Sequence, residues 1–108
     1  MYYRVLYEAI QVSRYIKKYH RLPPHYITKR KASLGRKKGS LNLAQSGKMI
    51  GGDIFHNRQK LLPPGHYREC DLGTYGKTSR GACRLVFSNN DDFYVTFDHY
   101  ASFVRIIV

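Results

Sequence analysis

Two titratable side chains and two arginines in the C-terminal half of the chain form a set that can do chemistry. Glu69 and His99 are separated by thirty positions, and Arg80 and Arg84 lie between them. A carboxylate and an imidazole can act as general base and general acid near neutral pH. Guanidinium groups match phosphate oxygens and stabilise the negative charge that a phosphodiester gains in its transition state. This set of groups would suit metal-free cleavage of RNA.

The balance of charge indicates a polyanionic partner. The 108 residues include 19 Lys and Arg against 7 Asp and Glu, which gives a formal net charge of +12. Residues 1–52 hold most of the basic residues and a single acid, Glu8, so the acids are concentrated in the half that contains Glu69 and His99. Such a charge favours binding to nucleic acid. By itself it does not separate a nucleic-acid enzyme from a passive binder.

The length and composition predict one globular domain spanning residues 1–108, because 43% of the residues are hydrophobic. No stretch is long enough to span a membrane, and no signal peptide is visible at the N-terminus, so we expect no membrane association. The two cysteines, Cys70 and Cys83, are too few for a structural zinc site and lack CxxC spacing. We therefore expect neither a metal ion nor another cofactor.

The first half of the chain has helical patterns. Apolar residues recur at helical spacing from about Arg4 to Tyr19, and the two prolines after Leu22 end this pattern. Thr28 can cap a short second helix over residues 29–34, which Gly35 closes. One further helical turn is predicted at residues 42–44.

The second half of the chain has strand patterns. After Gly51-Gly52, alternation with period two predicts strands over residues 67–72, 84–88, 93–97 and 103–107. Helices followed by antiparallel strands predict an α+β fold, in which the N-terminal helices pack on one face of a C-terminal antiparallel β-sheet.

This arrangement brings the reactive side chains together. Alternation puts Glu69 and Asp71 on one face of their strand, and Arg84 shares that face if it lies opposite Glu69. His99 reaches the same face from a turn. The predicted helices cannot cover both faces of the sheet. We therefore expect the face that bears these charged side chains to be open to a ligand.

The same register makes a prediction about the cysteines. It puts Cys70 opposite Cys83, with both side chains directed toward the helices. A disulfide is geometrically conceivable there, and two reduced thiols in contact are the favoured alternative.

Five short motifs occur in order and with nearly the spacing of a known family. They are Tyr26-Ile27-Thr28-Lys29, Ile50 to Phe55 followed by Asn57-Arg58, Arg68-Glu69, Arg80 with Arg84, and Asp98-His99-Tyr100 with Phe103. Together they resemble the barnase-like family of guanyl-specific microbial ribonucleases, and the match runs from roughly Ala9 to Ile106. A single motif would be a weak signal, whereas five in register are specific.

The resemblance implies a reaction and a catalytic set. The reaction is transesterification of single-stranded RNA, without a metal ion, to a 2′,3′-cyclic phosphate that is then hydrolysed. Glu69 would be the general base and His99 the general acid. The cationic groups around the phosphate would be Arg80, Arg84 and Lys29.

The resemblance also implies where substrate binds. The base-recognition residues would be Phe55, Asn57, Arg58 and Gln59, with Tyr100 stacking near the bound base. Two carboxylates would support the site without reacting, namely Asp53 and Asp71, and the second would orient the arginines. Gln59 stands where the family usually has a glutamate, whose charged carboxylate accepts hydrogen bonds from guanine. The neutral amide of Gln59 has one acceptor oxygen and no charge. We therefore expect a purine preference in which the bias for guanine is weaker or broadened toward adenine.

The family further implies partners and a biological setting. We expect a monomeric, cytotoxic effector domain that is secreted or delivered into target cells and is held in check by a small acidic inhibitor of the barstar kind. Two alternatives stay open: a noncatalytic basic RNA-binding module that retains the fold, and a ribosome-associated basic protein. The first would be expected to have lost Glu69, Arg84 or His99, and all three are present.

Overall fold

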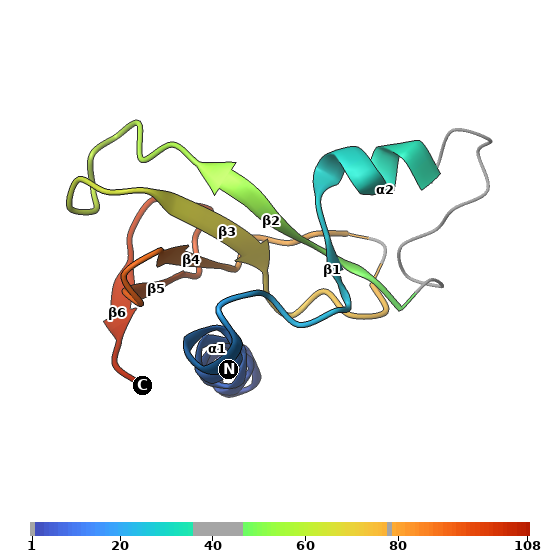
Figure 1. Ribbon diagram of the computed structural model, residues 1–108, viewed down its shortest axis with the longest axis horizontal. Helices are drawn as coiled ribbons and strands as arrows, with labels where there is room; N and C mark the ends of the chain where they lie inside the picture. Colours follow the sequence, from blue (N-terminus) through green and yellow to red (C-terminus); the bar gives the residue numbers. More distant parts are fainter. Residues whose placement is uncertain (1, 36–46, 78) are drawn as a thin grey trace.

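In the described part of the chain, a long helix is followed by a short strand, a short helix and five further strands (Figure 1). The computed structural model describes residues 2–35, 47–77 and 79–108, so the helical turn predicted at residues 42–44 lies outside the described residues. The elements are α1 Tyr3–Tyr19, β1 Tyr26–Ile27, α2 Lys29–Gly35, β2 Met49–Phe55, β3 Tyr67–Asp71, β4 Arg84–Ser88, β5 Phe93–Thr96 and β6 Val104–Ile106.

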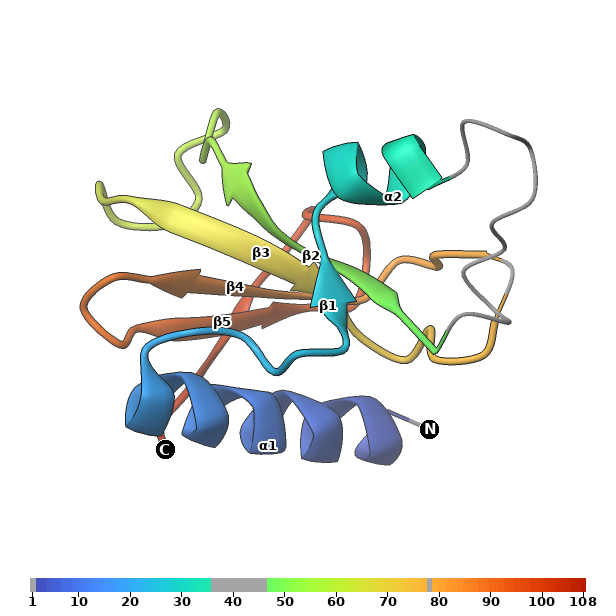
Figure 2. The same ribbon diagram turned by 45° about the vertical axis from the view of Figure 1, so that its right-hand side comes forward.

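Helix α1 forms where the periodicity predicts it and lies against one face of the sheet (Figure 2). Its buried positions are Ala9, Val12, Ser13 and Ile16. The helix ends because His20 adopts a left-handed conformation with φ of 58°, and its backbone N–H donates to the Ile16 carbonyl at 2.7 Å. In the part of the chain that the structure describes, no helix combines the length and apolar character needed to cross a membrane.

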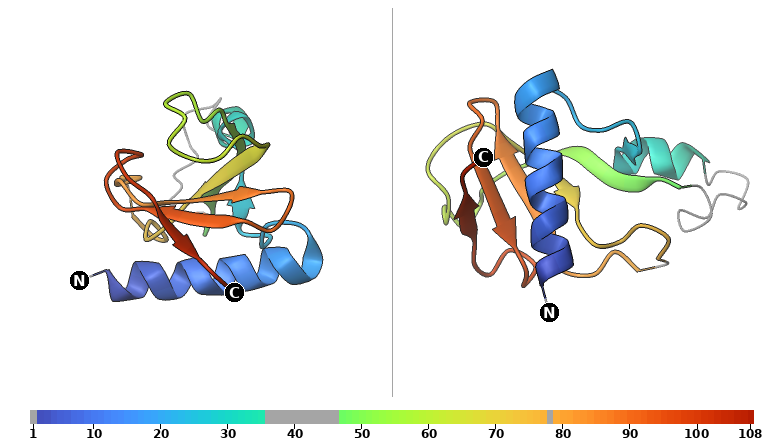
Figure 3. Two further views of the ribbon diagram at one scale, coloured as in Figure 1. Left: turned by 90° about the vertical axis from the view of Figure 1, so that its left-hand side faces the viewer. Right: turned by 90° about the horizontal axis from the view of Figure 1, so that it is seen from below.

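The C-terminal end of the chain returns to this helix, as the two views in Figure 3 show. Lys17 Nζ donates to the backbone oxygen of Val108 at 2.7 Å. The residues that follow β6, the last strand of the sheet, are thus joined to α1 by this hydrogen bond.

Helix α2 lies beside β1 and β2, on the side of the sheet away from α1 (Figure 1). The predicted cap is confirmed, since Thr28 Oγ1 accepts from the Lys31 N–H at 3.3 Å. Asp53 Oδ2 accepts from the Lys29 N–H at 3.0 Å. This second contact joins the start of the helix to β2 and positions Lys29 beside the open face of the sheet.

The six strands form one sheet in the order β1 to β6, in which β1 and β2 are parallel and every other pair is antiparallel. The predicted α+β fold is confirmed, with α1 packed on one face of a largely antiparallel sheet. The expectation that both helices share that face is wrong, because α2 lies on the side away from α1 (Figure 1). The strands at 67–72, 84–88, 93–97 and 103–107 are confirmed to within a residue or two at their ends. β1 and β2 were not predicted.

The predicted register between β3 and β4 is wrong by two residues. Arg84 lies opposite Asp71, and Glu69 lies opposite Val86. A shift of two leaves every side chain on the same face, so the hydrophobic pattern alone cannot distinguish the two registers. The observed register is favoured because it puts Arg84 Nε 3.1 Å from Asp71 Oδ1, directly across the strands.

The same correction separates the cysteines. Cys70 lies opposite Leu85, and Cys83 lies just before the first residue of β4, where its carbonyl accepts from the Leu72 N–H at 3.2 Å. Both thiols are free, Cys70 buried and Cys83 half-buried. Their predicted pairing across the strands is therefore wrong.

Apolar residues pack on both sides of the sheet. The larger cluster fills the space beneath α1 and includes Ala9, Val12, Ile16, Tyr26, Met49, Cys70, Leu72, Leu85, Phe93 and Val95. The smaller cluster lies on the opposite face and joins Leu62, Tyr67, Val86 and Tyr94, with Phe55 and Phe103 packed against it. On that face the row of side chains continues into buried charged groups, which are Glu69, Asp71 and Arg84.

Candidate active site

An open groove of about 1150 Å³ lies on the sheet face opposite α1. All five side chains predicted to be catalytic line it, although they come from five separate segments: Lys29, Glu69, Arg80, Arg84 and His99. Glu69 and Arg84 come from β3 and β4, Lys29 from the start of α2, and the other two from connecting loops. The carboxylate, the imidazole and the three cationic side chains therefore lie around one groove.

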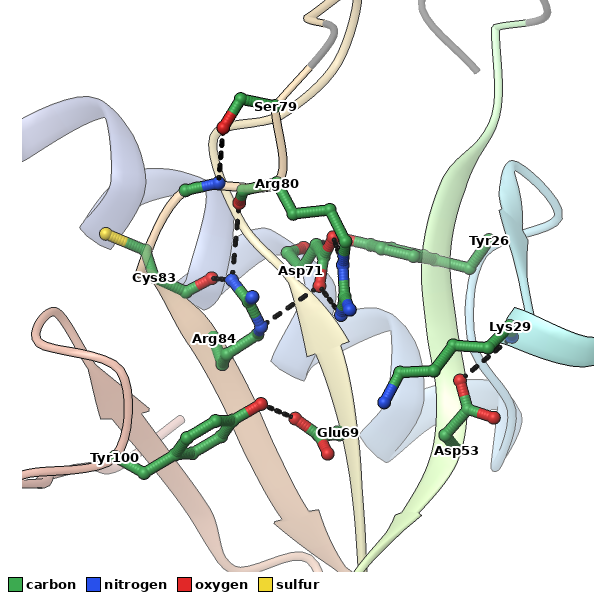
Figure 4. Close-up of polar contacts among 11 residues, drawn as sticks. Tyr26, Lys29, Asp53, Glu69, Asp71, Ser79, Arg80, Cys83, Arg84 and Tyr100 are labelled. Carbon is green, nitrogen blue, oxygen red and sulfur yellow. Dashed lines mark hydrogen bonds and ion pairs between the residues drawn. The ribbon is translucent and has the colours of Figure 1, made fainter. Parts of the chain in front are cut away.

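A tyrosine hydroxyl contacts Glu69 and holds its carboxylate in place (Figure 4). The Tyr100 hydroxyl donates a short hydrogen bond to Glu69 Oε1, and the carboxylate residue is only 8% exposed. Burial, and next the bond to Glu69, raise the pKa of Tyr100 to about 12. The hydroxyl therefore stays protonated at neutral pH and orients the carboxylate. Sequence reasoning gave Tyr100 only a stacking role.

A buried carboxylate organises the two arginines (Figure 4). Arg80 donates from Nε to Asp71 Oδ2 at 2.8 Å and from Nη2 to Oδ1 at 2.6 Å. Arg84 Nε contacts the same Oδ1 at 3.1 Å as an ion pair that lacks hydrogen-bond alignment, while its Nη1 donates to the Cys83 carbonyl at 2.8 Å. The hydrogen bonds to Asp71 raise the pKa of Arg80. Two guanidiniums share one carboxylate, which leaves excess positive charge at the groove.

His99 lies in the turn that joins β5 to β6, and its side chain is exposed. Its backbone φ is 54°, its N–H donates to the Ala82 carbonyl at 3.0 Å, and its ring centroid is 4.8 Å from that of Tyr100. Through Tyr100 the imidazole is thus connected to Glu69. The two side chains lie in the same groove and not on opposite sides of the molecule.

Two residues that sequence reasoning did not select hold this turn. Asp98 Oδ2 accepts from Ser102 Oγ at 2.6 Å and its Oδ1 accepts from Thr96 Oγ1 at 2.9 Å. Thr96 Oγ1 in turn accepts from the Tyr100 N–H at 3.0 Å. The signal was present in the sequence, since an Asp before a turn commonly bonds to nearby backbone and hydroxyl groups.

Asn57, one of the predicted base contacts, lines the groove from the loop that follows β2. Both ends of the Asn57 side-chain amide are bonded within the loop, since Nδ2 donates to the Leu62 carbonyl at 2.8 Å and Oδ1 accepts from the Leu62 N–H at 3.2 Å. Asn57 therefore shapes the loop. Arg58 and Gln59 are exposed and line the groove.

Two aromatic rings line the groove next to the loop that follows β2, which contains the predicted base-recognition residues. The rings of Phe55 and Tyr100 stack with centroids 5.5 Å apart and an interplanar angle of 27°. Phe103 meets Phe55 edge-on at 5.9 Å. Flat apolar faces beside cationic groups suit a nucleotide base next to its phosphate.

The groove also contains groups that were not predicted. Arg30, next to Lys29 on α2, and Arg68, next to Glu69 on β3, both line it. Among the described residues, no group of three His, Cys, Asp or Glu side chains is arranged to hold a metal ion.

Comparison with known proteins gives a consistent result. A family model described as ribonuclease matches residues 11–107. A ribonuclease of Heyndrickxia coagulans is 46% identical over 101 residues, which cover 88% of this chain and 92% of that protein. A ribonuclease of Bacillus intermedius is also 46% identical over 101 residues, and the match covers 62% of its length.

More distant relatives share part of the chain. The guanyl-specific ribonuclease Sa3 of Kitasatospora aureofaciens is 43% identical over 60 residues, which cover 51% of this chain and 42% of that protein. Among solved structures, ribonuclease Sa2 in complexes with mononucleotides is 30% identical, covers 74% of this chain and 81% of its own, and superposes with a TM-score of 0.49.

Proposed function

Because this chain belongs to the ribonuclease family and is an endoribonuclease, we propose that it cleaves single-stranded RNA in two steps. In the first step the 2′-oxygen attacks the adjacent phosphorus, and the 5′-oxygen of the next nucleotide leaves. The products are a 2′,3′-cyclic phosphate end and a free 5′-hydroxyl. In the second step water opens the cyclic phosphate to a 3′-phosphate.

Glu69 and His99 carry the protons in this proposal. Glu69 takes the proton of the attacking 2′-hydroxyl, while His99, in its protonated form, gives a proton to the leaving 5′-oxygen. In the second step the roles reverse, so His99 takes the proton of water and Glu69 returns one to the 2′-oxygen. Each side chain then regains its starting protonation state.

The cations stabilise the phosphate during both steps. Arg80, Arg84 and Lys29 face the oxygens on which negative charge develops, and Asp71 fixes the two guanidiniums in advance. Preorganised donors of this kind contribute about 100- to 1000-fold each in other enzymes. Asp53 acts indirectly by capping the helix that carries Lys29.

The observation that carries the proposal is that a carboxylate, an imidazole and three cationic side chains from distant parts of the sequence line a single groove. The test is cleavage of single-stranded RNA in the presence of EDTA by wild type, Glu69→Gln and His99→Gln. Loss of general acid or base should lower kcat by about 100- to 10,000-fold. His25→Gln, which changes a histidine outside the groove, is the matched control. Binding of RNA without cleavage by the wild type would contradict the proposal.

Base preference depends on Gln59. We propose a purine-preferring enzyme that retains a bias for guanine, weakened because the Gln59 amide offers one acceptor oxygen and no charge. The guanyl-specific relative supports the guanine part of this statement. Dinucleotides with guanine or adenine 5′ of the scissile bond should differ in kcat/KM by less for wild type than for Gln59→Glu. An unchanged ratio in the variant would contradict the role of this position.

The biological setting is a separate proposal. A cytotoxic effector that is secreted or delivered into target cells would need an inhibitor in the cell that makes it, and a net charge of +12 suits a small acidic protein. Such an inhibitor should form a one-to-one complex with a monomeric enzyme and abolish RNA cleavage. Its association rate should fall steeply as salt is added, because opposite charges accelerate encounter. Co-expression with a candidate acidic protein, followed by light scattering of the complex, tests these statements.

A further inference from the structure

A second hollow, here called the rear pocket, lies on the α1 side of the sheet. Its floor is a row of three side chains that lie directly opposite one another on β2, β3 and β4, namely Ile54, Arg68 and Phe87. Helix α1 ends at Tyr19, and the chain leaves it next to this row. The row forms the base of a hollow of about 660 Å³, and its Phe87 also packs against the apolar cluster beneath α1.

The walls of the rear pocket are rich in cationic and imidazole groups. His20 and Arg21 come from the end of α1, His56 from the end of β2 and His66 from the residue before β3, and all four are exposed. Asp91, in the turn between β4 and β5, is the acidic residue among those that line it. Because Arg21 and Arg68 outnumber this carboxylate, the pocket carries net positive charge even with neutral histidines.

The rear pocket adjoins the catalytic groove around the end of β2. Ile54, Phe55, His56 and Arg68 line both spaces. β1 pairs with β2 only at Met49 and Ile50, so strand pairing does not block this part of the β2 edge. A flexible single strand can therefore pass from one face of the sheet to the other at this point.

We propose that the rear pocket binds one nucleotide of the RNA on the 5′ side of the recognised base. This inference rests on the proposed function, in which the loop from Phe55 to Gln59 holds the nucleoside 5′ of the scissile phosphate and His99 protonates the oxygen on the 3′ side. The rear pocket shares Phe55 and His56 with the first of these regions and does not include His99. The strand that reaches it is therefore the upstream one.

The chemistry of the pocket suits one nucleotide. Arg21 and Arg68 supply two guanidiniums for a phosphate, and Phe87 supplies an aromatic ring for a base. Arg68 is already oriented, since its Nη1 donates to the Gly52 carbonyl at 2.7 Å. The volume falls in the range of pockets that hold small ligands.

The test compares a cleavable dinucleotide with the same dinucleotide extended on its 5′ side or on its 3′ side. The variant is Arg21→Ala combined with His66→Ala, and the control is Arg14→Ala, which removes an exposed charge of α1 outside both the groove and the rear pocket. For wild type, kcat/KM should rise when the substrate is extended on its 5′ side. In the double variant the ratio of the 5′-extended substrate to the dinucleotide should fall by about 3- to 10-fold, since the cation that neutralises the phosphate of the added nucleotide is removed. The ratio for the 3′-extended substrate should not change.

Three results would overturn the inference: a wild-type ratio near unity for the 5′ extension, an equal fall in Arg14→Ala, or an equal fall for the 3′ extension. The second would show diffuse attraction by the basic surface, and the third would show a different path for the RNA. Failure of the proposed function is distinguishable, because the wild type would then cleave none of the three substrates.

Discussion

At the scale of single residues, Tyr100 links two parts of the site. Its ring stacks on Phe55 beside the base loop, and its hydroxyl holds Glu69. A base that enters next to this ring would therefore lie beside the side chain that holds the proposed general base. In the proposed mechanism Tyr100 would be a positioning residue, because its hydroxyl would act on the reaction through the carboxylate.

Tyr100→Phe should keep the aromatic stack and lose the bond to Glu69. A hydrogen bond to a charged group contributes about 1.5–3 kcal/mol, so we expect kcat to fall by about 10- to 100-fold while KM for a dinucleotide changes little. Tyr7→Phe, on the exposed side of α1, is the matched control. A rise in KM with unchanged kcat would show that the hydroxyl serves substrate binding instead.

The residue types of the site could be predicted from the sequence, whereas several of their partners could not. A candidate proton acceptor, a candidate proton donor and clustered cationic residues can be identified from the sequence, and the family motifs assign each of them a position. The bond from Tyr100 to Glu69 depends on a turn in which His99 and Tyr100 both have positive φ, 54° and 75°. Non-glycine residues rarely adopt a positive φ, so this turn conformation could not be predicted from the sequence. The internal bonds of Asn57 were missed for a related reason, since they depend on the left-handed backbone at that residue.

At the scale of elements, β2 is the longer of the two strands that were not predicted from the sequence. It contains two adjacent glycines and a β-bulge between Gly51 and Asp53, so its residues do not alternate cleanly. Its place in the sheet depends on contacts with distant residues, which local patterns do not encode. The two-residue error in the register of β3 and β4 has the same origin, because only the ion pair between Asp71 and Arg84 distinguishes the two registers.

Gly51→Ala should destabilise the fold where β1, β2 and β3 meet. A Cβ atom at this position would lie 2.6 Å from Tyr26 Cδ1 and 2.7 Å from Cys70 Cβ, and both neighbours are buried. Overpacking of this kind costs about 1–3 kcal/mol in the free energy of unfolding. Urea denaturation measures the loss. Gly65→Ala is the control, because the corresponding contacts there begin at 3.5 Å. Equal effects of the two substitutions would contradict the close approach at Gly51.

The turn between β5 and β6 should respond to acid through Asp98. Hydrogen bonds from Ser102, and then from Thr96, hold the pKa of this carboxyl below its usual range. Its stabilising effect is therefore full above the pKa of an unfolded aspartate, about 3.9, and is lost as the pH falls through the lower folded-state pKa. The free energy of unfolding of wild type should exceed that of Asp98→Asn by a constant amount from about pH 5 to pH 7, and the difference should shrink below about pH 4.

Urea denaturation across this pH range measures that difference. Asp91→Asn removes the same charge from another exposed turn and controls for the change in net charge. A difference that grows as the pH falls would reverse the sign of the linkage and contradict the hydrogen-bond explanation.

At the scale of the whole molecule, charge and fold have separate origins in the sequence. The fold class followed from the order of helical and strand patterns, which depends on apolar spacing and on capping and turn residues, not on net charge. The basic charge is spread over both faces: Lys29 and Arg30 stand at the groove, while Arg14, Lys18 and Arg21 are exposed on or next to α1. A long RNA can therefore contact cations well beyond the groove, whereas a dinucleotide cannot.

This distribution predicts that salt sensitivity depends on substrate length. Each phosphate that is neutralised on a single strand contributes about −0.7 to the slope of log affinity against log salt concentration. For a dinucleotide, log kcat/KM should fall with a slope near −0.7, because one phosphate is held in the groove. For a long RNA the slope should be several times steeper, since phosphates outside the groove meet the cations of α1 and α2. Steady-state cleavage at several concentrations of a monovalent salt measures both slopes. Equal slopes for the two substrates would confine RNA binding to the groove and would leave the remaining positive charge without a role in substrate binding.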